Sequence, residues 1–340
     1  MAKKTSLNIV ALIDPETFYP EDPQFELARK EVRTNLEFHV VEALRTLGHD
    51  VEVMPFSKDI QQNVRNLIEK APDLVFNMTE HYGGDRQKDM HIASLLELIG
   101  IPFTGTGAEG LFLCRDKAVG KIILNRHQIA VPQFTALPVG RTRLRRKLTF
   151  PLIVKPALMD GSDGISLASV VSNEEELQER VEHLHNRTRQ KVICEEYVMG
   201  REIYVGVLGN ARLTVLPARE LQFNSLEGNA PQIATARVKL DAEYRKKWKI
   251  EYSFAELSAE MEKKVSRISK RIYRLLHLQD YGRIDMRIRP DGTVVFLEAN
   301  SNPDLTLGDE LAEAASRSGL SYKDLIDLIV RLAVQRQDTG

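Results

Sequence analysis

The stretch YGRIDMRIRPDGTVVFLEANSNPDL, residues Tyr281 to Leu305, contains two apolar runs separated by the turn-forming residues RPDG. We expect the two runs to pair as a β-hairpin, because Pro, Asp and Gly favour tight turns between strands. Side chains alternate between the two faces of a strand, so Glu298 and Asn300 share one face, and Asp285 can join them from the partner strand. The hairpin therefore predicts two carboxylates and an amide oxygen close together on one sheet.

Oxygen ligands without His or Cys suit Mg²⁺ or Mn²⁺ ions that bridge phosphate groups. The alternative is that Asp285, Glu298 and Asn300 are polar positions on the solvent-facing side of a strand. The segment FPLIVKPALMDGSDGIS bears on this choice, because it places Lys155 at the end of an apolar run and glycines just after it. Such a loop can hold an anion with its backbone N–H groups, although it is neither a P-loop nor a GxGxxG sequence.

A surface turn with a lysine reaching out from a strand end would explain the Lys155 segment equally well when the segment is taken alone. The two segments together favour a site for phosphate and metal, because each supplies what the other lacks. The acids of the hairpin would hold the metal, and the lysine and its loop would hold the phosphate.

Periodicity outside these segments predicts an α/β chain. Apolar residues on one helical stripe from Leu36 to Leu47 end at Gly48, and the alternating run DVEVMPF follows. With the apolar run DLVFNM further on, this strand–helix–strand order is typical of a parallel sheet. The run from Leu7 to Ile13 is too short to span a membrane and reads as the first strand.

The amino-acid composition disfavours several classes of protein. The 340 residues are 43% hydrophobic, enough for a substantial core and two or three domains. A formal net charge of −1 gives no reason to expect nucleic acid or a membrane as the main partner, and the basic run from Arg141 to Leu148 is typical of a solvated connection. The two cysteines, Cys114 and Cys194, lack CxxC spacing, which disfavours a zinc site or disulfide framework and fits a cytoplasmic location.

Five segments occur in the order and spacing of the ATP-grasp enzymes: LLELIGIPFTGTG, RDKAVGK, FPLIVKPALMDGSDGIS, ICEEYVMGREI and GRIDMRI…FLEANSNPDLT. Among these enzymes the chain most resembles the D-alanine–D-alanine ligases, over about Asp73 to Thr306 and a plausible C-terminal helix. The resemblance implies an ATP-grasp fold, with an N-terminal parallel α/β domain and two α+β lobes that sandwich the nucleotide. The implied boundaries are 1–105 for the N-terminal domain, 106–198 for the central lobe and 199–340 for the C-terminal lobe.

The resemblance also implies roles for individual residues. Lys117 and Lys155 would hold the ATP phosphates, with the loop at Gly161 and Ser162 closing over them. Arg283 would be catalytic and stabilise the tetrahedral intermediate. Asp285, Glu298 and Asn300 would bind two Mg²⁺ ions, with Mn²⁺ as a substitute. The remaining contacts to ATP would come from Glu195, Glu196, Tyr197, Val198, Glu202 and Leu297.

The activity implied is that of an ATP-dependent carboxylate–amine ligase, which joins small-molecule substrates through an acylphosphate and releases ADP and phosphate. A homodimer is one expected assembly. The alternative is a nucleotide-binding ATP-grasp protein without ligase turnover, acting as a regulatory or partner-binding module. The presence of Lys155, Asp285, Glu298 and Asn300 argues against that alternative.

Departures from the family pattern concern the amino-acid substrates. The N-terminal substrate loop is not recognisable around Glu16, and Asp304 stands where the family has a glycine. The family's serine and leucine for the second substrate's carboxylate have no clear match in LGDELAEAAS. We therefore expect that the second substrate is not D-alanine, or that its carboxylate is held differently.

Two further loops are expected to lie close to the ATP phosphates. Asp163 places a carboxylate in the phosphate loop, where it needs a metal, an amine or an outward rotamer to be tolerated. The stretch NSLEGNAPQIATARVKL occupies the place of the family's mobile lid, from which Arg237 or Lys239 would reach the γ-phosphate. Exposed loop charge is the alternative for that stretch.

Overall fold

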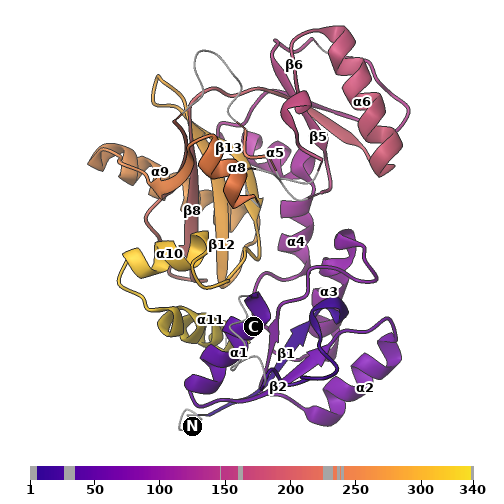
Figure 1. The fold of residues 1–340 in the computed structure, drawn as a ribbon, viewed down its shortest axis with the longest axis vertical. Helices are drawn as coiled ribbons and strands as arrows, with labels where there is room; N and C mark the ends of the chain where they lie inside the picture. The colour runs from indigo at the N-terminus through magenta and orange to yellow at the C-terminus, as the bar shows by residue number, and fades with distance from the viewer. Residues whose placement is uncertain are drawn as a thin grey trace.

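The computed structural model describes residues 6–26, 35–145, 147–159, 164–224, 233–235, 238 and 241–337 (Figure 1). Over these residues the strands form a parallel sheet near the N-terminus and two antiparallel sheets after it. The α/β fold class expected from the sequence is present. Among the described helices, none is both long enough and apolar enough to cross a membrane.

The N-terminal sheet has the strand order β2-β1-β3, with all strands parallel. Alternate residues of β1 pack on opposite sides: Ile9 and Ala11 belong to one core, and Val10 and Leu12 to another. Both faces of the sheet are therefore buried, as parallel sheets require. The elements of this region are β1 (Asn8–Ile13), η1 (Pro15–Thr17), α1 (Leu36–Thr46), β2 (Asp50–Pro55), α2 (Ile60–Lys70), β3 (Leu74–Asn77), η2 (Arg86–Lys88) and α3 (Asp89–Ile99).

The second sheet has the order β4-β7-β5-β6 and is antiparallel. Helix α6 packs on it through Leu177, Val181 and Leu184, and begins where the Asn173 side chain accepts a hydrogen bond from the N–H of Glu176. The elements are α4 (Ala108–Arg115), α5 (Lys117–Arg126), β4 (Phe134–Leu137), β5 (Leu152–Pro156), η3 (Leu167–Ser169), β6 (Val170–Val171), α6 (Glu174–Thr188) and β7 (Val192–Glu196).

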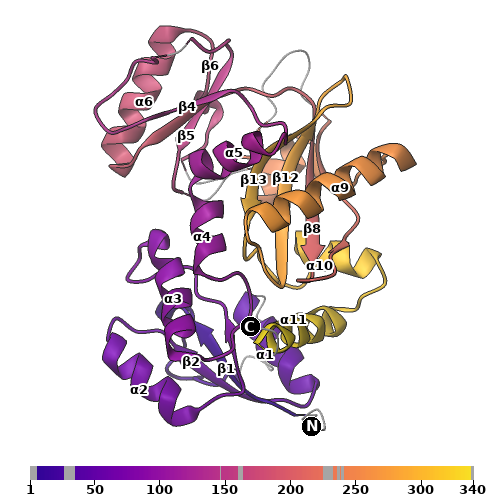
Figure 2. The same ribbon diagram turned by 180° about the vertical axis from the view of Figure 1, so that it is seen from behind.

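The third sheet has the order β11-β10-β8-β12-β13, with β9 paired to β8. The expected hairpin is β12 and β13, and its register places Asp285 opposite Glu298 and Arg283 opposite Asn300. Figure 2 shows α9 lying across this sheet. The elements are β8 (Arg201–Leu208), β9 (Thr214–Val215), β10 (Arg219–Phe223), α8 (Ala242–Lys247), β11 (Ile250–Phe254), α9 (Ala259–Leu275), β12 (Tyr281–Ile288) and β13 (Val294–Asn300).

The last two helices follow the third sheet, and the second of them packs against the N-terminal region. They are α10 (Glu310–Arg317) and α11 (Tyr322–Gln337). Helix α11 packs against α1 (Figure 1) and against β3. Its Leu325, Ile329 and Ala333 share a core with Ile9 and Ala11 of β1. The C-terminal end of the chain therefore covers one face of the N-terminal sheet. The three domain boundaries expected from the sequence remain a prediction.

Candidate active site

The C-terminal sheet separates an apolar face from a charged one. On β12, Asp285 and Arg287 alternate with buried apolar residues such as Ile284, which belongs to the core that α9 covers. Asp285 lies opposite Glu298 on β13, and Arg287 lies opposite Glu202 on β8. The alternation that buries one face thus collects charged side chains on the other.

The three predicted metal ligands meet on this charged face. Asp285 is only 2% exposed, and its carboxylate accepts hydrogen bonds from Arg283 Nε at 2.8 Å and Nη2 at 3.0 Å. Asn300 Nδ2 donates to Asp285 Oδ2 at 3.2 Å, and Arg283 Nη1 also donates to Glu310 at 2.6 Å. Burial disfavours the charge of Arg283, but Asp285 and Glu310 hold the pKa of its guanidinium well above the usual value.

The chemistry of these side chains fits Mg²⁺. Among the described residues no group of three or more His, Cys, Asp and Glu side chains is arranged to enclose a metal. Mg²⁺ does not need such a group, because it is usually bound by one or two carboxylates together with water and substrate phosphates. Asp285 and Glu298, with the amide oxygen of Asn300, supply that smaller set of oxygen ligands. Their role as metal ligands remains a prediction.

A cavity of about 60 Å³ lies between the second and third sheets and contains most of the predicted ATP contacts. On its wall, Lys155 Nζ lies 3.0 Å from Glu195 Oε2. Burial alone would lower the pKa of Lys155, but Glu195 and Glu298 outweigh it and raise this pKa. The predicted residues that line the cavity are Lys155, Glu195, Glu196, Tyr197, Val198, Glu202, Leu297, Asp285 and Glu298.

Arg287 in the same wall was missed by the sequence analysis. Its guanidinium donates to Glu202 Oε2 from Nε at 3.0 Å and from Nη2 at 2.6 Å, and from Nη1 to the Val198 carbonyl at 2.5 Å. Tyr204 donates to the other Glu202 oxygen at 2.8 Å. The signal was present in the sequence, since Arg287 has the same parity as Asp285 along β12 and so projects from the same face.

A second cavity of about 210 Å³ adjoins the first and reaches the N-terminal region. Glu298 lines both cavities, and Lys117, Arg283 and Asn300 line the second. Lys117 Nζ lies 3.9 Å from Glu298 Oε2, and it also donates to the Met159 carbonyl. The predicted phosphate and metal groups therefore meet where the two cavities join.

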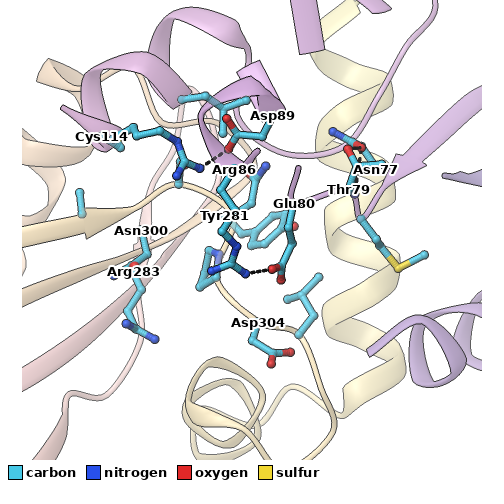
Figure 3. A pocket seen from close by; sticks show the side chains of 18 of the residues that line it. Asn77, Thr79, Glu80, Arg86, Asp89, Cys114, Tyr281, Arg283, Asn300 and Asp304 are labelled. Atoms are coloured by element: carbon cyan, nitrogen blue, oxygen red, sulfur yellow. Dashed lines mark hydrogen bonds and ion pairs between the residues drawn. The ribbon is translucent and has the colours of Figure 1, made fainter. Parts of the chain in front are cut away.

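Residues from the N-terminal sheet region complete the second cavity. Figure 3 shows the ion pair of Arg86 with Glu80 inside it, and a second pair joins Arg115 to Asp89. Glu80, Arg86 and Asp89 lie in the segment that follows β3, as expected for the ligand-binding edge of a parallel sheet, whereas Arg115 ends α4. The sequence analysis singled out none of these four residues. Arg86 and Glu80 are six positions apart, whereas Arg115 and Asp89 are 26 positions apart and meet through the packing of α4 and α3.

Asp304 and Glu16, both named above among the departures from the family pattern, differ in position. Asp304 lines the larger cavity (Figure 3), and its Oδ1 accepts hydrogen bonds from Thr306 N at 2.7 Å and Oγ1 at 2.6 Å. Burial and the nearby Asp304 raise the pKa of Asp309 to about 6. Glu16 instead lies 3.2 Å from His81 Nε2.

Several predicted residues cannot be placed. Gly161 and Ser162, together with Asp163, Arg237 and Lys239, lie outside the described residues. Their expected roles at the phosphates remain predictions.

Comparisons with known proteins bear on this arrangement. A family model described as "D-ala D-ala ligase C-terminus" matches residues 123–331. A D-alanine–D-alanine ligase of Aquifex aeolicus is 30% identical over 89% of this chain and 96% of its own. An uncharacterized protein of Sinorhizobium fredii is also 30% identical, over 94% of this chain and 91% of its own.

A similar fold is seen in a solved structure. The D-alanine–D-alanine ligase of Bacillus anthracis, crystallised with ATP, superimposes with a TM-score of 0.73 at 21% identity, covering 98% of this chain and 99% of the other. The ATP-grasp fold expected from the sequence is therefore confirmed.

Proposed function

Because the chain belongs to the family of the D-alanine–D-alanine ligase C-terminal domain, we propose that it is an ATP-dependent ligase that joins a small carboxylate to an amine. ADP and phosphate are the other products. The observation that carries the proposal is the position of Glu298, which lines both the nucleotide cavity and the larger cavity beside it. A phosphoryl group passing from ATP to a second substrate must cross this junction.

The reaction has two steps. An oxygen of the substrate carboxylate attacks the γ-phosphorus of ATP, the bond to the bridging oxygen breaks, and ADP leaves. The amine then attacks the carbonyl carbon of the acylphosphate, loses a proton and expels phosphate. Both steps bring negative groups together or build charge on oxygen, so positive side chains fixed in place lower the barrier.

Three cationic side chains support this reaction scheme. Lys155 in the smaller cavity and Lys117 at the junction orient the phosphates from two sides. Asp285 and Glu310 hold the guanidinium of Arg283 at the larger cavity, where it would stabilise the oxygen on which charge develops. Mg²⁺ held by Asp285, Glu298 and Asn300 would screen the repulsion between phosphate and carboxylate.

Asp304 supports a narrower proposal about the amine. Its carboxylate is on the wall of the larger cavity, and Asp309 beside it adds a second acid. A free carboxylate on the amine substrate would be repelled there, since charges interact strongly away from bulk water. The amine substrate therefore carries positive charge or no carboxylate at that end, unlike D-alanine.

Phosphate release tests the function directly. The protein is supplied with ATP, Mg²⁺ and D-alanine alone, then with D-alanine plus alaninamide or basic amino acids, and products are identified by mass. We expect phosphate release that depends on the amino acids, with a product equal in mass to the two substrates minus water. Nucleotide binding without such release would contradict the ligase proposal and favour a binding module. Efficient synthesis of D-alanyl-D-alanine would overturn the narrower proposal.

A further inference from the structure

Lys121 is the most completely buried charged group beside the nucleotide cavity and has no role in the reaction described above. Its side chain is 0% exposed. The Nζ atom lies 2.9 Å from Glu195 Oε1 and donates to the Leu297 carbonyl at 2.6 Å. The Phe296 ring centroid lies 5.5 Å away.

These contacts join the two walls of the cavity. Glu195 belongs to β7 of the second sheet, whereas Leu297 belongs to β13 of the third, and both line the cavity. Lys121 projects from α5, one helical turn after Lys117. One ammonium group thus connects three elements and sets where two of the wall groups lie.

Charge explains why a lysine is needed there. Glu195 Oε2 also pairs with Lys155 at 3.0 Å, so one carboxylate is shared by two ammonium groups. The three groups carry a net charge of +1, which complements a nucleotide phosphate. Without Lys121, Glu195 would neutralise Lys155 alone, and these groups would lose their net positive charge.

Stability alone gives a weaker explanation. Burial lowers the pKa of Lys121 to about 8 although Glu195 opposes the shift, so burying this charge has a cost. Replacing a whole buried ion pair by apolar groups is often neutral or stabilising for the fold, although removing one partner alone is destabilising. An apolar pair in place of Lys121 and Glu195 would serve the fold equally well, so the cavity beside them explains the charges better than stability does.

We propose that Lys121 is a positioning residue for ATP: it fixes Glu195 and the Leu297 carbonyl in the cavity wall and leaves Lys155 available to a phosphate. This inference rests on the proposed function, because it concerns the same nucleotide site. Lys121 acts through its neighbours and does not touch the reacting atoms, so its effect belongs to nucleotide affinity and not to the chemical step.

Binding of AMPPNP with Mg²⁺ tests the inference in the full-length protein. We expect Lys121→Met to raise the dissociation constant by about tenfold or more, to raise the KM for ATP similarly, and to change kcat by less than about threefold. The KM for the amino acid should not change. The matched control is Lys264→Met, because Lys264 also donates to a backbone carbonyl, that of Gly292 at 2.6 Å, but lines neither cavity. Its nucleotide binding should equal that of the wild type.

The double variant Lys121→Met/Glu195→Gln separates charge balance from simple loss of packing. It restores the net charge of +1 and should bind AMPPNP more tightly than Lys121→Met alone, whereas a packing defect would not be rescued. If Lys121→Met does not fold, Lys121→Gln removes the charge but keeps a donor for the Leu297 carbonyl, and the same comparison applies. Equal binding by the wild type and the lysine variants would overturn the inference. A wild type that fails to bind AMPPNP would instead contradict the proposed function.

Discussion

Glu298 is the side chain on which the proposed chemistry depends most directly. It is 13% exposed, lies opposite Asp285 in the hairpin, and faces Lys117 at the junction of the cavities. Glu298→Gln preserves the shape of the side chain and removes one negative charge of the proposed Mg²⁺ site. We expect turnover to fall by at least ~100-fold with the fold retained, measured by ATP-dependent phosphate release and circular dichroism.

Asp291 provides the control for Glu298. It lies in the turn of the same hairpin, where its Oδ1 accepts a hydrogen bond from the Thr293 N–H at 2.8 Å, and it is exposed. Asp291→Asn removes the same charge from the same hairpin, away from both cavities, and should leave turnover within about twofold. Near-normal phosphate release by Glu298→Gln would show that the metal assignment is wrong.

The connection between β7 and β8 shows how a short segment positions several site residues at once. Gly200 has a φ of +137°, and a Cβ added there would lie 2.2 Å from the Ile288 carbonyl oxygen. The backbone can pass this close to β12 only without a side chain. The same connection carries Val198, whose carbonyl accepts from Arg287, and leads into Glu202.

We expect Gly200→Ala to lower the free energy of unfolding by about 3 kcal/mol or more, through steric overlap and backbone strain. Urea denaturation measures the change, and weaker AMPPNP binding should accompany it. Gly140→Ala is the matched control, since Gly140 has a φ of +84° but nothing within 4 Å of an added Cβ. Strain alone should cost about 1 kcal/mol there. Equal losses in the two variants would mean that the close approach to Ile288 does not matter.

The assembled chain depends on a contact between its last helix and segments far away in sequence. Arg336 of α11 donates to the carbonyls of Phe103 at 2.6 Å and Gly105 at 2.8 Å, and lies 3.3 Å from Asp280 Oδ2. Asp280 is 0% exposed and precedes β12 directly. Arg336 thus ties the C-terminal helix to both the N-terminal region and the β12–β13 hairpin.

We expect Arg336→Met to destabilise the protein by about 3–5 kcal/mol, because it leaves the carboxylate of Asp280 buried without its cation. Burial already raises the pKa of Asp280, and Arg336 opposes that shift. Without Arg336 this pKa rises further, so protonation at low pH removes the buried charge. The loss of stability should therefore be smaller at pH 5 than at pH 8 in urea denaturation.

Arg331→Met is the control on the same helix. Arg331 pairs with Asp327 at 2.9 Å while its side chain is 54% exposed, and such pairs contribute little. The change in unfolding free energy should stay below about 0.5 kcal/mol. A similar small change for Arg336→Met, or a loss that does not vary with pH, would contradict the structural role given to Asp280 and Arg336.

Local patterns were enough to predict much of this protein. The alternation along β12 and β13 and the turn between them predicted the hairpin, but the register shifts by one residue between Met286 and Asp285, and this irregularity places Glu298 opposite Asp285. The helical stripe of α1 and the strand runs around it likewise predicted the parallel sheet. The apolar repeat of 3.6 residues in a helix and of 2 residues in a strand depends only on neighbours in the chain. The ATP-grasp fold followed from the resemblance of five segments.

Contacts between distant elements could not be predicted in this way. Glu195, Lys121 and Lys155 come from β7, α5 and β5, and nothing local to any of them indicates that one carboxylate serves two buried amines. Arg336 likewise finds Asp280 only because α11 packs against the N-terminal sheet. Which charged side chains form pairs depends on how the sheets and helices pack. Burial then makes each pair important for stability, because an unpaired charge away from water is costly.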